Sequence, residues 1–263
     1  MRTANLLLFS ILILISACAP VYAPPDPPQV LLIQLSPALS WMTSSMNTCA
    51  LRSGTLGLVI DETRIDRINP EALIIHVGDI ELPNATVYEI SRSELKFIVN
   101  PLNPLCSIEF PALISFFDGT ITSWDQLGVE AGAIKLWQYP DSGGIRRLAS
   151  EGLGISIPLN IPIGIAPNPI AMRELVAREP NALGYLLDRF MDQTVKSLEI
   201  SGADRDQFTV PVLASTTRSL STDEYAWLAC VSLEITACNE YLLSEAPGFH
   251  WELLDKVAQN LQI

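Results

Sequence analysis

The sequence alternates short, continuous apolar runs with segments in which apolar residues recur at helical spacing. An unbroken apolar run of about five residues is typical of a strand buried on both faces of a parallel sheet. Strands that alternate with helices in this way predict an α/β sheet. The runs that predict strands in the first part of the chain are 30–35, 57–61, 72–77 and 94–99.

The rest of the chain continues the alternation less regularly. A helix is expected to begin at Ser36-Pro37, because serine is a good N-cap and proline suits the first turn. Residues 161–166 are expected to be irregular, because Pro162 and Gly164 are both awkward in a central strand. Further strands are predicted at 133–137, 183–186 and 195–200, and helices at 110–117, from 145, at 169–178, 225–234 and 251–261.

The first residues predict export. The apolar run Leu6–Ser16 is long enough for the core of a signal peptide and too short for a membrane span. The apolar run is followed by small residues and then Cys18, and this pattern resembles the bacterial lipobox. The resemblance implies cleavage before Cys18 and attachment of a lipid to Cys18. An ordinary signal peptide with an incidental cysteine is the alternative. A lipid would anchor the protein to the outer face of the cell membrane without crossing it.

A proline-dense segment separates this signal from the body of the protein. Such segments run extended and semi-rigid, so we interpret 1–17 as a signal peptide and 18–29 as a tether. The remainder is long enough for two lobes of ordinary size. A net charge of −13, without a basic stripe, excludes a nucleic-acid partner. The same charge repels anionic lipid head groups, so the anchoring is assigned to the lipid.

Four cysteines remain in the body of the protein, and an exported compartment permits disulfides. Cys230 and Cys238 are close in sequence and are one expected pair, which leaves Cys49 with Cys106. The sequence does not fix the connectivity, and buried free thiols are the alternative. With two histidines and no CxxC, neither a metal site nor another cofactor is expected.

The segment Phe97–Gly128, FIVNPLNPLCSIEFPALISFFDGTITSWDQLG, resembles the substrate-binding proteins of phosphate ABC transporters, the PstS-like family. In that family an apolar strand ends in Asn-Pro, and a second Asn-Pro follows. A helix then leads to a phenylalanine, a glycine, Ile-Thr-x-Trp and a final glycine. The stretches KLWQYPDSGGIR and REPNALGYL match two later family motifs in the right order. We interpret FFDGTITSWDQLG as scaffold, in which Gly119 ends the helix and Trp124 packs the loop down.

The resemblance implies the two-lobed, type 2 periplasmic-binding-protein fold, in which two α/β lobes are joined by two crossing strands around a ligand cleft. Phe97–Asn100 would be the first crossover and Leu183–Leu187 the second. The first lobe would then comprise 30–100 plus 188–263, and the second lobe 101–187.

The function that the resemblance implies is solute binding. A monomeric, membrane-anchored lipoprotein would bind phosphate or another small anion outside the cytoplasm and deliver it to an ABC permease. The alternative is a sensor or envelope interaction module that keeps the fold but has lost phosphate binding. An enzyme is not expected, because the sequence shows no nucleophile elbow, metal-ligand spacing or Ser-His-carboxylate set.

An oxyanion site needs backbone N–H groups at helix N-termini, hydroxyl donors and usually an arginine. In this fold such groups gather where strands end at the cleft. The resemblance implies an aspartate that accepts a proton from a protonated oxyanion, and Asp141 lies near that place but is shifted by one position from the motif. Plain N-cap or turn roles remain open for Asp141 and for its neighbours. The candidate ligand-binding residues are Ser36, Thr63, Asp141, Ser142, Gly143 and Gly144.

The sequence departs from the family pattern at the motif that supplies the main cation. Gln138, Pro140 and Gly144 stand where the family has arginine, aspartate and threonine. Arg146 and Arg147 are close by, but one turn into a helix they need not reach the cleft. Phosphate as the ligand is therefore less firmly indicated than the fold. His76, in the run ALIIHVG, is interpreted as a hydrogen-bonded strand histidine.

Overall fold

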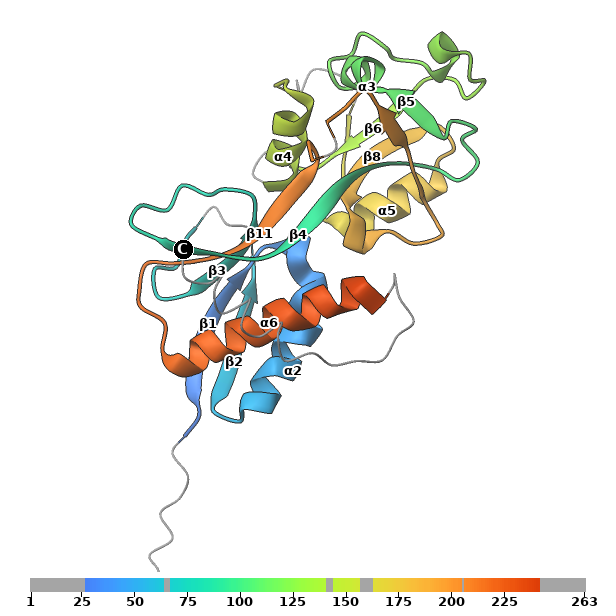
Figure 1. Cartoon of the computed structure of the whole chain (residues 1–263). Helices are drawn as coiled ribbons and strands as arrows, with labels where there is room; N and C mark the ends of the chain where they lie inside the picture. Colours follow the sequence, from blue (N-terminus) through green and yellow to red (C-terminus); the bar gives the residue numbers. More distant parts are fainter. Residues whose placement is uncertain (1–26, 64–66, 141–143, 157–162, 205, 242–263) are drawn as a thin grey trace, which may run out of the picture.

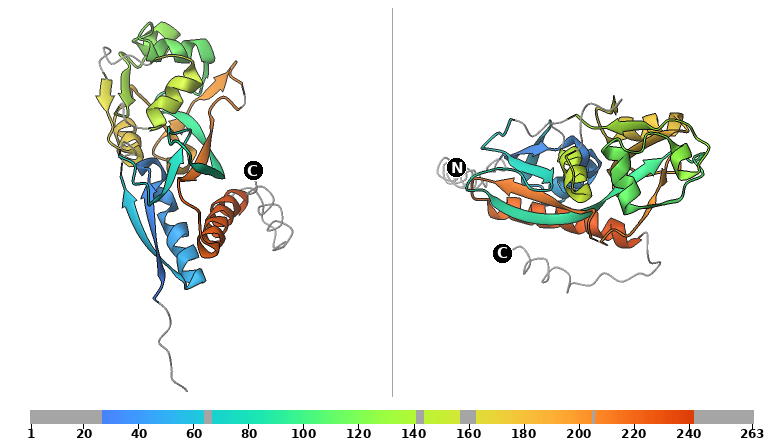
Figure 2. Two further views of the ribbon diagram at one scale, coloured as in Figure 1. Left: turned by 90° about the vertical axis from the view of Figure 1, so that its left-hand side faces the viewer. Right: turned by 90° about the horizontal axis from the view of Figure 1, so that it is seen from above.

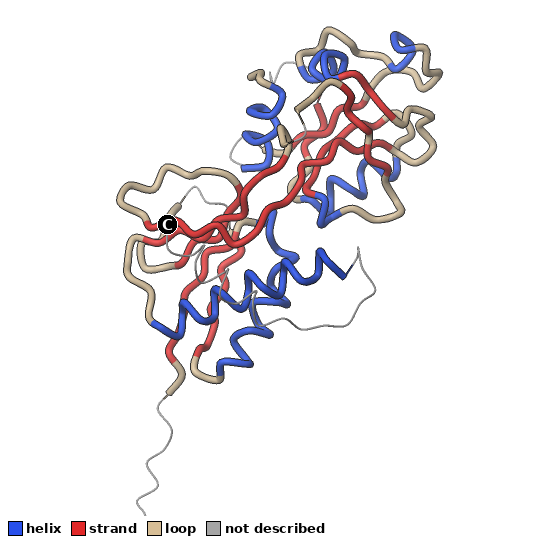
Figure 3. The backbone as a smooth tube through the Cα atoms, in the orientation of Figure 1, coloured by secondary structure: helices blue, strands red, loops and turns tan. Residues whose placement is uncertain are grey.

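The computed structural model describes residues 27–63, 67–140, 144–156, 163–204 and 206–241. The predicted signal peptide, most of the tether and the helix predicted at 251–261 lie outside these residues. Two lobes lie end to end, with strands through the middle and helices outside them (Figures 1 and 3). Among the described helices, none is long and apolar enough to cross a membrane.

The main sheet runs through both lobes, with neighbouring strands in the order β2-β1-β3-β11-β4-β8-β6-β7. The strands β2, β1 and β3 at one end of this order belong to the first lobe, and β8, β6 and β7 at the other end belong to the second lobe. The α/β class and the two-lobed fold predicted from the sequence are confirmed. The strands are β1 (Gln29–Leu35), β2 (Leu56–Glu62), β3 (Leu73–Val77), β4 (Thr86–Val99), β6 (Lys135–Gln138), β7 (Ile163–Ile165), β8 (Ala182–Leu187) and β11 (Thr209–Thr216).

The first lobe is built on the parallel strands β1, β2 and β3. After β1 the chain forms the 3-10 helix η2 (Pro37–Met42) and the helix α2 (Thr43–Ser53), which ends at Gly54 with a φ of 64°. The long helix α6 (Thr222–Tyr241) lies beside α2 (Figure 1). Apolar residues of β1, among them Leu31 and Ile33, are buried in the core, as their unbroken run predicts.

The second lobe packs three helices around β6, β7 and β8: α3 (Phe110–Phe117), α4 (Gly144–Leu153) and α5 (Pro169–Arg178). Asn168 caps α5 by accepting the backbone N–H of Ala171. Smaller elements complete the lobe. They are β5 (Ser107–Glu109), η3 (Trp124–Leu127), η4 (Asp188–Phe190), β9 (Lys196–Ser197) and β10 (Glu199–Ser201).

The stretch FFDGTITSWDQLG forms the scaffold that the sequence predicts. The helix α3 ends at Phe117, and Gly119 follows with a φ of 83°. Trp124 is fully buried, lies edge-on to Phe116 with ring centroids 5.1 Å apart, and donates its indole N–H to the Asn181 carbonyl at 2.9 Å. The loop is therefore fixed to the lobe by its tryptophan.

The strands that join the lobes differ from the prediction. β4 passes between the lobes, since it pairs with β11 through residues 86–94 and with β8 through 95–99, whereas the expected crossover was 97–100. The expected second crossover, 183–187, is β8, which pairs with β6 and the far part of β4. The strand that runs beside β4 between the lobes is β11 (Figure 2). The sequence analysis missed β11, because proline and hydroxyl residues interrupt its apolar pattern.

The segment between these strands also differs from the prediction. Residues 195–200 are predicted as one strand, but they form β9 and β10. β9 pairs with Ile98–Val99 of β4, and β10 pairs with β5. β9 thus joins the second-lobe end of the main sheet, whereas β10 and β5 form a separate two-stranded sheet, so the chain stays beside the second lobe beyond Asp188. Pairing partners of this kind are set by tertiary packing, which a local apolar pattern does not encode.

Residues 163–165, expected to be irregular, form the strand β7 at the edge of the sheet, where a glycine is tolerated. Gly164 permits a close approach, because a Cβ atom there would lie 2.3 Å from the ring of Trp137. Trp137 lies directly across from Gly164 on β6. The glycine that weakens the strand pattern in the sequence is therefore required by the packing.

The observed disulfide corrects the predicted pairs. Cys49 of α2 is bonded to Cys230 of α6, and Cys106 is free and exposed. Cys230 and Cys238 lie eight positions apart in one helix, which separates them by about 12 Å, whereas a disulfide needs Cα atoms within about 7 Å. The sequence could not show that α2 and α6 lie side by side.

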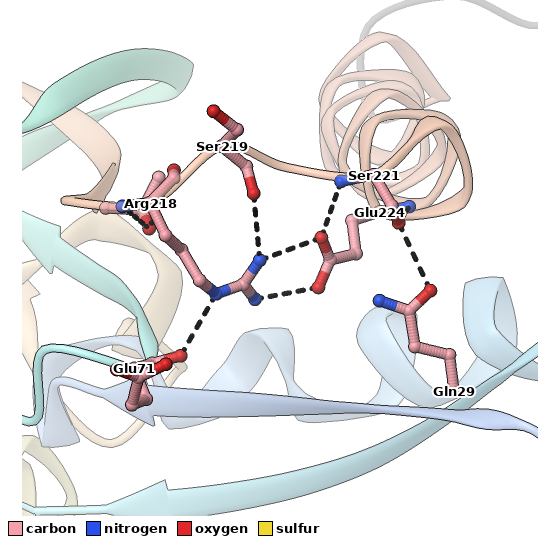
Figure 4. Close-up of polar contacts among 7 residues, drawn as sticks. Gln29, Glu71, Arg218, Ser219, Ser221 and Glu224 are labelled. Atoms are coloured by element: carbon pink, nitrogen blue, oxygen red, sulfur yellow. Dashed lines mark hydrogen bonds and ion pairs between the residues drawn. The ribbon is translucent and has the colours of Figure 1, made fainter.

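The start of α6 is held by a network of polar contacts (Figure 4). Ser221 and Glu224 form a capping box, in which the Glu224 carboxylate accepts the Ser221 N–H at 2.7 Å and the Ser221 hydroxyl accepts the Glu224 N–H. Arg218 donates to both carboxylate oxygens of Glu224, at 2.9 and 2.7 Å, and to the Glu71 carbonyl. The network therefore connects the end of β11 to α6 and to the turn before β3.

Candidate functional site

Two predicted site residues lie side by side where the first strands end. The Ser36 N–H donates to the Ile75 carbonyl of β3 at 2.9 Å, and the Thr63 N–H donates to the Leu35 carbonyl of β1 at 3.2 Å. Ser36 is the N-cap residue of η2, but its hydroxyl makes no capping hydrogen bond. The hydroxyl is therefore not committed to stabilising the helix.

The start of α4 reaches the same edge of the sheet from the other lobe. Gly144 is the first residue of α4, and a Cβ atom there would lie 3.7 Å from the carbonyl oxygen of Val77, the last residue of β3. Ile75, which binds the Ser36 N–H, is two residues earlier on β3. The structure thus brings Ser36, Thr63 and Gly144 to one edge. Asp141, Ser142 and Gly143 lie outside the described residues.

Contacts beside Gly144 hold the two lobes together. Gly78 follows β3 with a φ of 62°, and a Cβ atom there would lie 2.5 Å from Leu148 of α4. Arg147 donates to the Asp79 carbonyl. Arg146, one residue earlier, is buried, at 5% exposed. The first turns of α4 therefore pack against the first lobe, and they bring a buried cation to the junction of the lobes.

The chain leads into this junction from β6, whose last residue is Gln138. Gln138 is fully buried, and neither the nitrogen nor the oxygen of its amide has a hydrogen-bond partner. The Tyr139 hydroxyl is also buried without a partner. Burial raises the pKa of the Tyr139 phenol well above its ordinary value, and the nearby Tyr185 adds to this shift. Neither residue was a candidate from sequence, although a glutamine that ends an apolar strand is a usable signal.

His76 is a hydrogen-bonded strand histidine, as predicted. Its Nδ1 lies 2.7 Å from the Gly78 carbonyl, which can only accept, so Nδ1 carries the proton. Nε2 therefore accepts from the Ser215 hydroxyl at 2.8 Å. A neighbouring cavity of about 40 Å³, lined by His76, Asp79 and Ser215 among others, has room for about one water molecule. It is no candidate for a solute site.

His76 is expected to make the protein less stable in mild acid. Burial is the main cause that lowers the pKa of His76 below its ordinary value of 6.5, although the Gly78 carbonyl and Asp79 oppose the shift. The unfolded chain therefore takes up the proton first as the pH falls. The free energy of unfolding should fall below about pH 6.5 and continue to fall until the lowered pKa is passed.

Urea denaturation at about pH 7.5 and about pH 5.5 tests this expectation, because the two values bracket the ordinary histidine pKa. His76→Gln should reduce the difference in unfolding free energy between the two pH values. The same difference in the wild type and in His76→Gln would contradict the assignment to His76.

The solved structures that resemble this chain share its two-lobed fold. A phosphate ABC transporter substrate-binding protein with bound phosphate from Clostridium perfringens superimposes with a TM-score of 0.73 at 17% identity, covering 80% of this chain and 97% of that one. An ABC-type phosphate transport receptor from Vibrio cholerae gives 0.61 at 14% identity, covering 81% and 97%. The reduced OxyR regulatory domain from Pseudomonas aeruginosa gives 0.57 at 12%, covering 78% and 98%.

These likenesses show the fold alone. No protein-family model matches the sequence, and no curated protein matches it. The chain has the two-lobed, periplasmic-binding-protein-type fold of these structures at low sequence identity, in agreement with the fold that the resemblance of Phe97–Gly128 implies.

Proposed function

We propose that this chain is an exported solute-binding lipoprotein, a divergent relative of PstS-like proteins, that binds phosphate or another small anion for an ABC transporter. The observation that carries the proposal is the meeting of Ser36, Thr63 and Gly144 at one edge of the sheet. These residues come from both lobes, as the two sides of a ligand cleft do. The fold neighbour from Clostridium perfringens, which has bound phosphate, supports the same class of ligand.

The chemistry of this edge suits an anion. Ser36 and Thr63 offer hydroxyl donors, and the N-terminus of α4 carries the positive end of the helix dipole. Arg146 lies buried in the first turn of that helix and adds positive charge at the same end. In an acidic protein, with a net charge of −13, a local concentration of donors is required to hold an anion.

The proposed location follows from the N-terminal sequence. The lipid on Cys18 anchors the protein to the outer face of the membrane, and 18–29 holds the lobes away from it. The protein acts as a monomer beside its permease. Its role is binding and release, without catalysis.

Calorimetric titration of the full exported chain in detergent tests the proposal. The titrants are phosphate, sulfate, molybdate and small carboxylates, and saturable binding of at least one of them is expected. Ser36→Ala should weaken that binding about tenfold, because a hydrogen bond to a charged ligand is lost.

The matched control is Ser91→Ala, which removes a hydroxyl that bonds only its neighbour's carbonyl on β4. It should bind as the wild type does. A wild-type protein that gives no saturable heat with any of the titrants would contradict the proposed function.

A further inference from the structure

The sheet of the first lobe is covered differently on its two faces. Successive residues of a strand point to opposite faces. Leu31 and Ile33 of β1 are buried in the same core as Cys49 of α2. Cys49 is bonded to Cys230, so α6 lies on this face of the sheet as well (Figure 2). Val30, which points to the opposite face, is 58% exposed.

The opposite face carries apolar residues that the described chain leaves uncovered. Val30 pairs in register with Gly57 of β2, and Leu32 pairs with Val59. Residues at matching positions of parallel strands point to the same side, so these four residues share one surface, which we name the open face. Val59 is 52% exposed. A Cβ atom at Gly57 would meet no atom of the described residues within 4 Å, so the surface is open above it.

An open face is unusual on strands of this kind. β1 pairs in parallel with both β2 and β3, and parallel sheets occur almost only with both faces covered. A helix between successive parallel strands normally provides the cover, in a connection of a dozen or more residues. Residues 63–72 connect β2 to β3 and are fewer than that. Their contacts with the Gln34 amide cover only the far end of β1.

The chain after α6 carries the pattern of a helix that needs a surface to pack on. Residues 242–263 lie outside the described residues, and the sequence predicts a helix at 251–261 after the turn signal Pro247-Gly248. Such a helix is amphipathic, with polar residues opposite an apolar stripe, and it must bury that stripe to be stable. The stripe comprises Trp251, Leu254, Ala258 and Leu261.

The open face is within reach of this segment. Glu234 of α6 forms an ion pair with Arg52, in the last turn of α2, and Leu56 begins β2 four residues later. β2 is an edge strand, so the chain can pass round it without crossing another strand. Residues 242–250 span up to about 30 Å, whereas passing from the helix layer to the far side of the sheet takes about 20 Å, or two packed layers.

We propose that residues 251–261 form a helix that packs its apolar stripe on the open face and completes the first lobe. The missing side chain at Gly57 leaves a flat position that a large side chain of this helix covers. A segment of the same chain has a high effective concentration at the open face, so it is favoured over a second copy of the protein. The inference does not depend on the proposed ligand.

Hydrogen exchange of the full chain tests whether the segment is packed. An isolated helix of this length is marginal in water, so its amides would exchange almost freely. Packing on the sheet should slow exchange at 251–261 at least about 100-fold. Leu254→Asp should remove this protection, and the matched control Gln259→Asp, which adds the same carboxylate on the polar side, should keep it. Unprotected amides in the wild type, or equal protection in the two variants, overturn the inference.

Thermal unfolding tests whether the open face is the surface that is covered. Val59→Thr adds a hydroxyl, which should lower the Tm by about 2–4 °C if a helix buries it. The matched control is Val87→Thr, at a valine that is 49% exposed on β4, four strands away. It should change the Tm by less than about 2 °C, as exposed substitutions do.

The two changes should also depend on each other. In the Leu254→Asp background the open face is no longer covered, so Val59→Thr should have no further effect on the Tm. A loss of the same size in both backgrounds overturns the proposed contact.

The concentration of the protein separates the segment from a second copy as the cover. Protection by a segment of the same chain is independent of concentration, whereas protection by a second copy falls on dilution. Exchange rates at 251–261 that stay constant over a 100-fold dilution support the inference. Rates that rise on dilution overturn it and assign the open face to self-association.

Discussion

Removal of the Cys49–Cys230 disulfide is expected to lower the free energy of unfolding by about 5 kcal/mol. The two cysteines are 181 residues apart in sequence, so the bond closes a loop that covers most of the described chain. Without the bond, the unfolded chain gains the freedom of that loop, and this gain grows with loop length. Denaturation of the double variant Cys49→Ala/Cys230→Ala, compared with the wild type, measures the loss.

The matched control is Cys106→Ser, which changes an exposed free thiol. An exposed substitution of this kind should alter the unfolding free energy by less than about 0.5 kcal/mol. If the double variant loses no more than Cys106→Ser does, the bond contributes nothing to stability and the expectation is wrong.

Loss of the Arg218 side chain is expected to lower the free energy of unfolding by about 3 kcal/mol, because it leaves a buried carboxylate unpaired. The Glu224 side chain is 1% exposed and forms a two-point ion pair with Arg218 (Figure 4). Arg218→Met keeps most of the aliphatic contact and removes the charge. Glu224→Gln should lower the free energy of unfolding by less, because a neutral amide needs no counter-charge. The Arg218 side chain that it leaves without a carboxylate is 29% exposed and can be hydrated.

The pH dependence of this loss identifies its cause. The hydrogen bonds from Arg218 are the main reason that the pKa of Glu224 lies below its ordinary value of 4.5. The stabilisation is therefore fully present above about pH 4.5 and disappears as the pH falls through the lowered pKa. Denaturation curves of Arg218→Met and the wild type should be far apart at neutral pH and approach each other in acid.

An exposed ion pair provides the comparison. Arg92 and Glu89 have side chains that are 65% and 45% exposed, so Arg92→Met should cost less than about 1 kcal/mol. A loss for Arg218→Met no larger than that for Arg92→Met would contradict the role of burial.

Much of the fold could be predicted because its signals are local. The runs 30–35 and 72–77 form β1 and β3, since an unbroken apolar run must be buried on both faces. The helices predicted at 110–117 and 169–178 were correct to the residue, with a proline near each start. The scaffold role of Trp124 was also predictable, because a large indole in a short loop has few places to pack.

The site could be predicted only in part, for a similar reason. Ser36 and Thr63 each follow a strand, and parallel strands end at a common edge, so the two residues lie near each other, while their part in ligand binding remains a prediction. Asp141, Ser142 and Gly143 lie outside the described residues and remain predictions. The unsatisfied atoms of Gln138 and Tyr139 could not be predicted, because a missing partner depends on everything packed around the side chain.

The α/β class, the position of most strands and helices, and the resemblance to PstS-like proteins follow from the amino-acid sequence without the structure. Each depends on the spacing of residues that are near one another along the chain. Three features became known from the folded chain: Cys49 bonds Cys230, β11 runs beside β4, and Gly144 lies against Val77 across the lobes. These contacts join residues far apart in sequence, and they depend on how complete elements pack together, which no local pattern records.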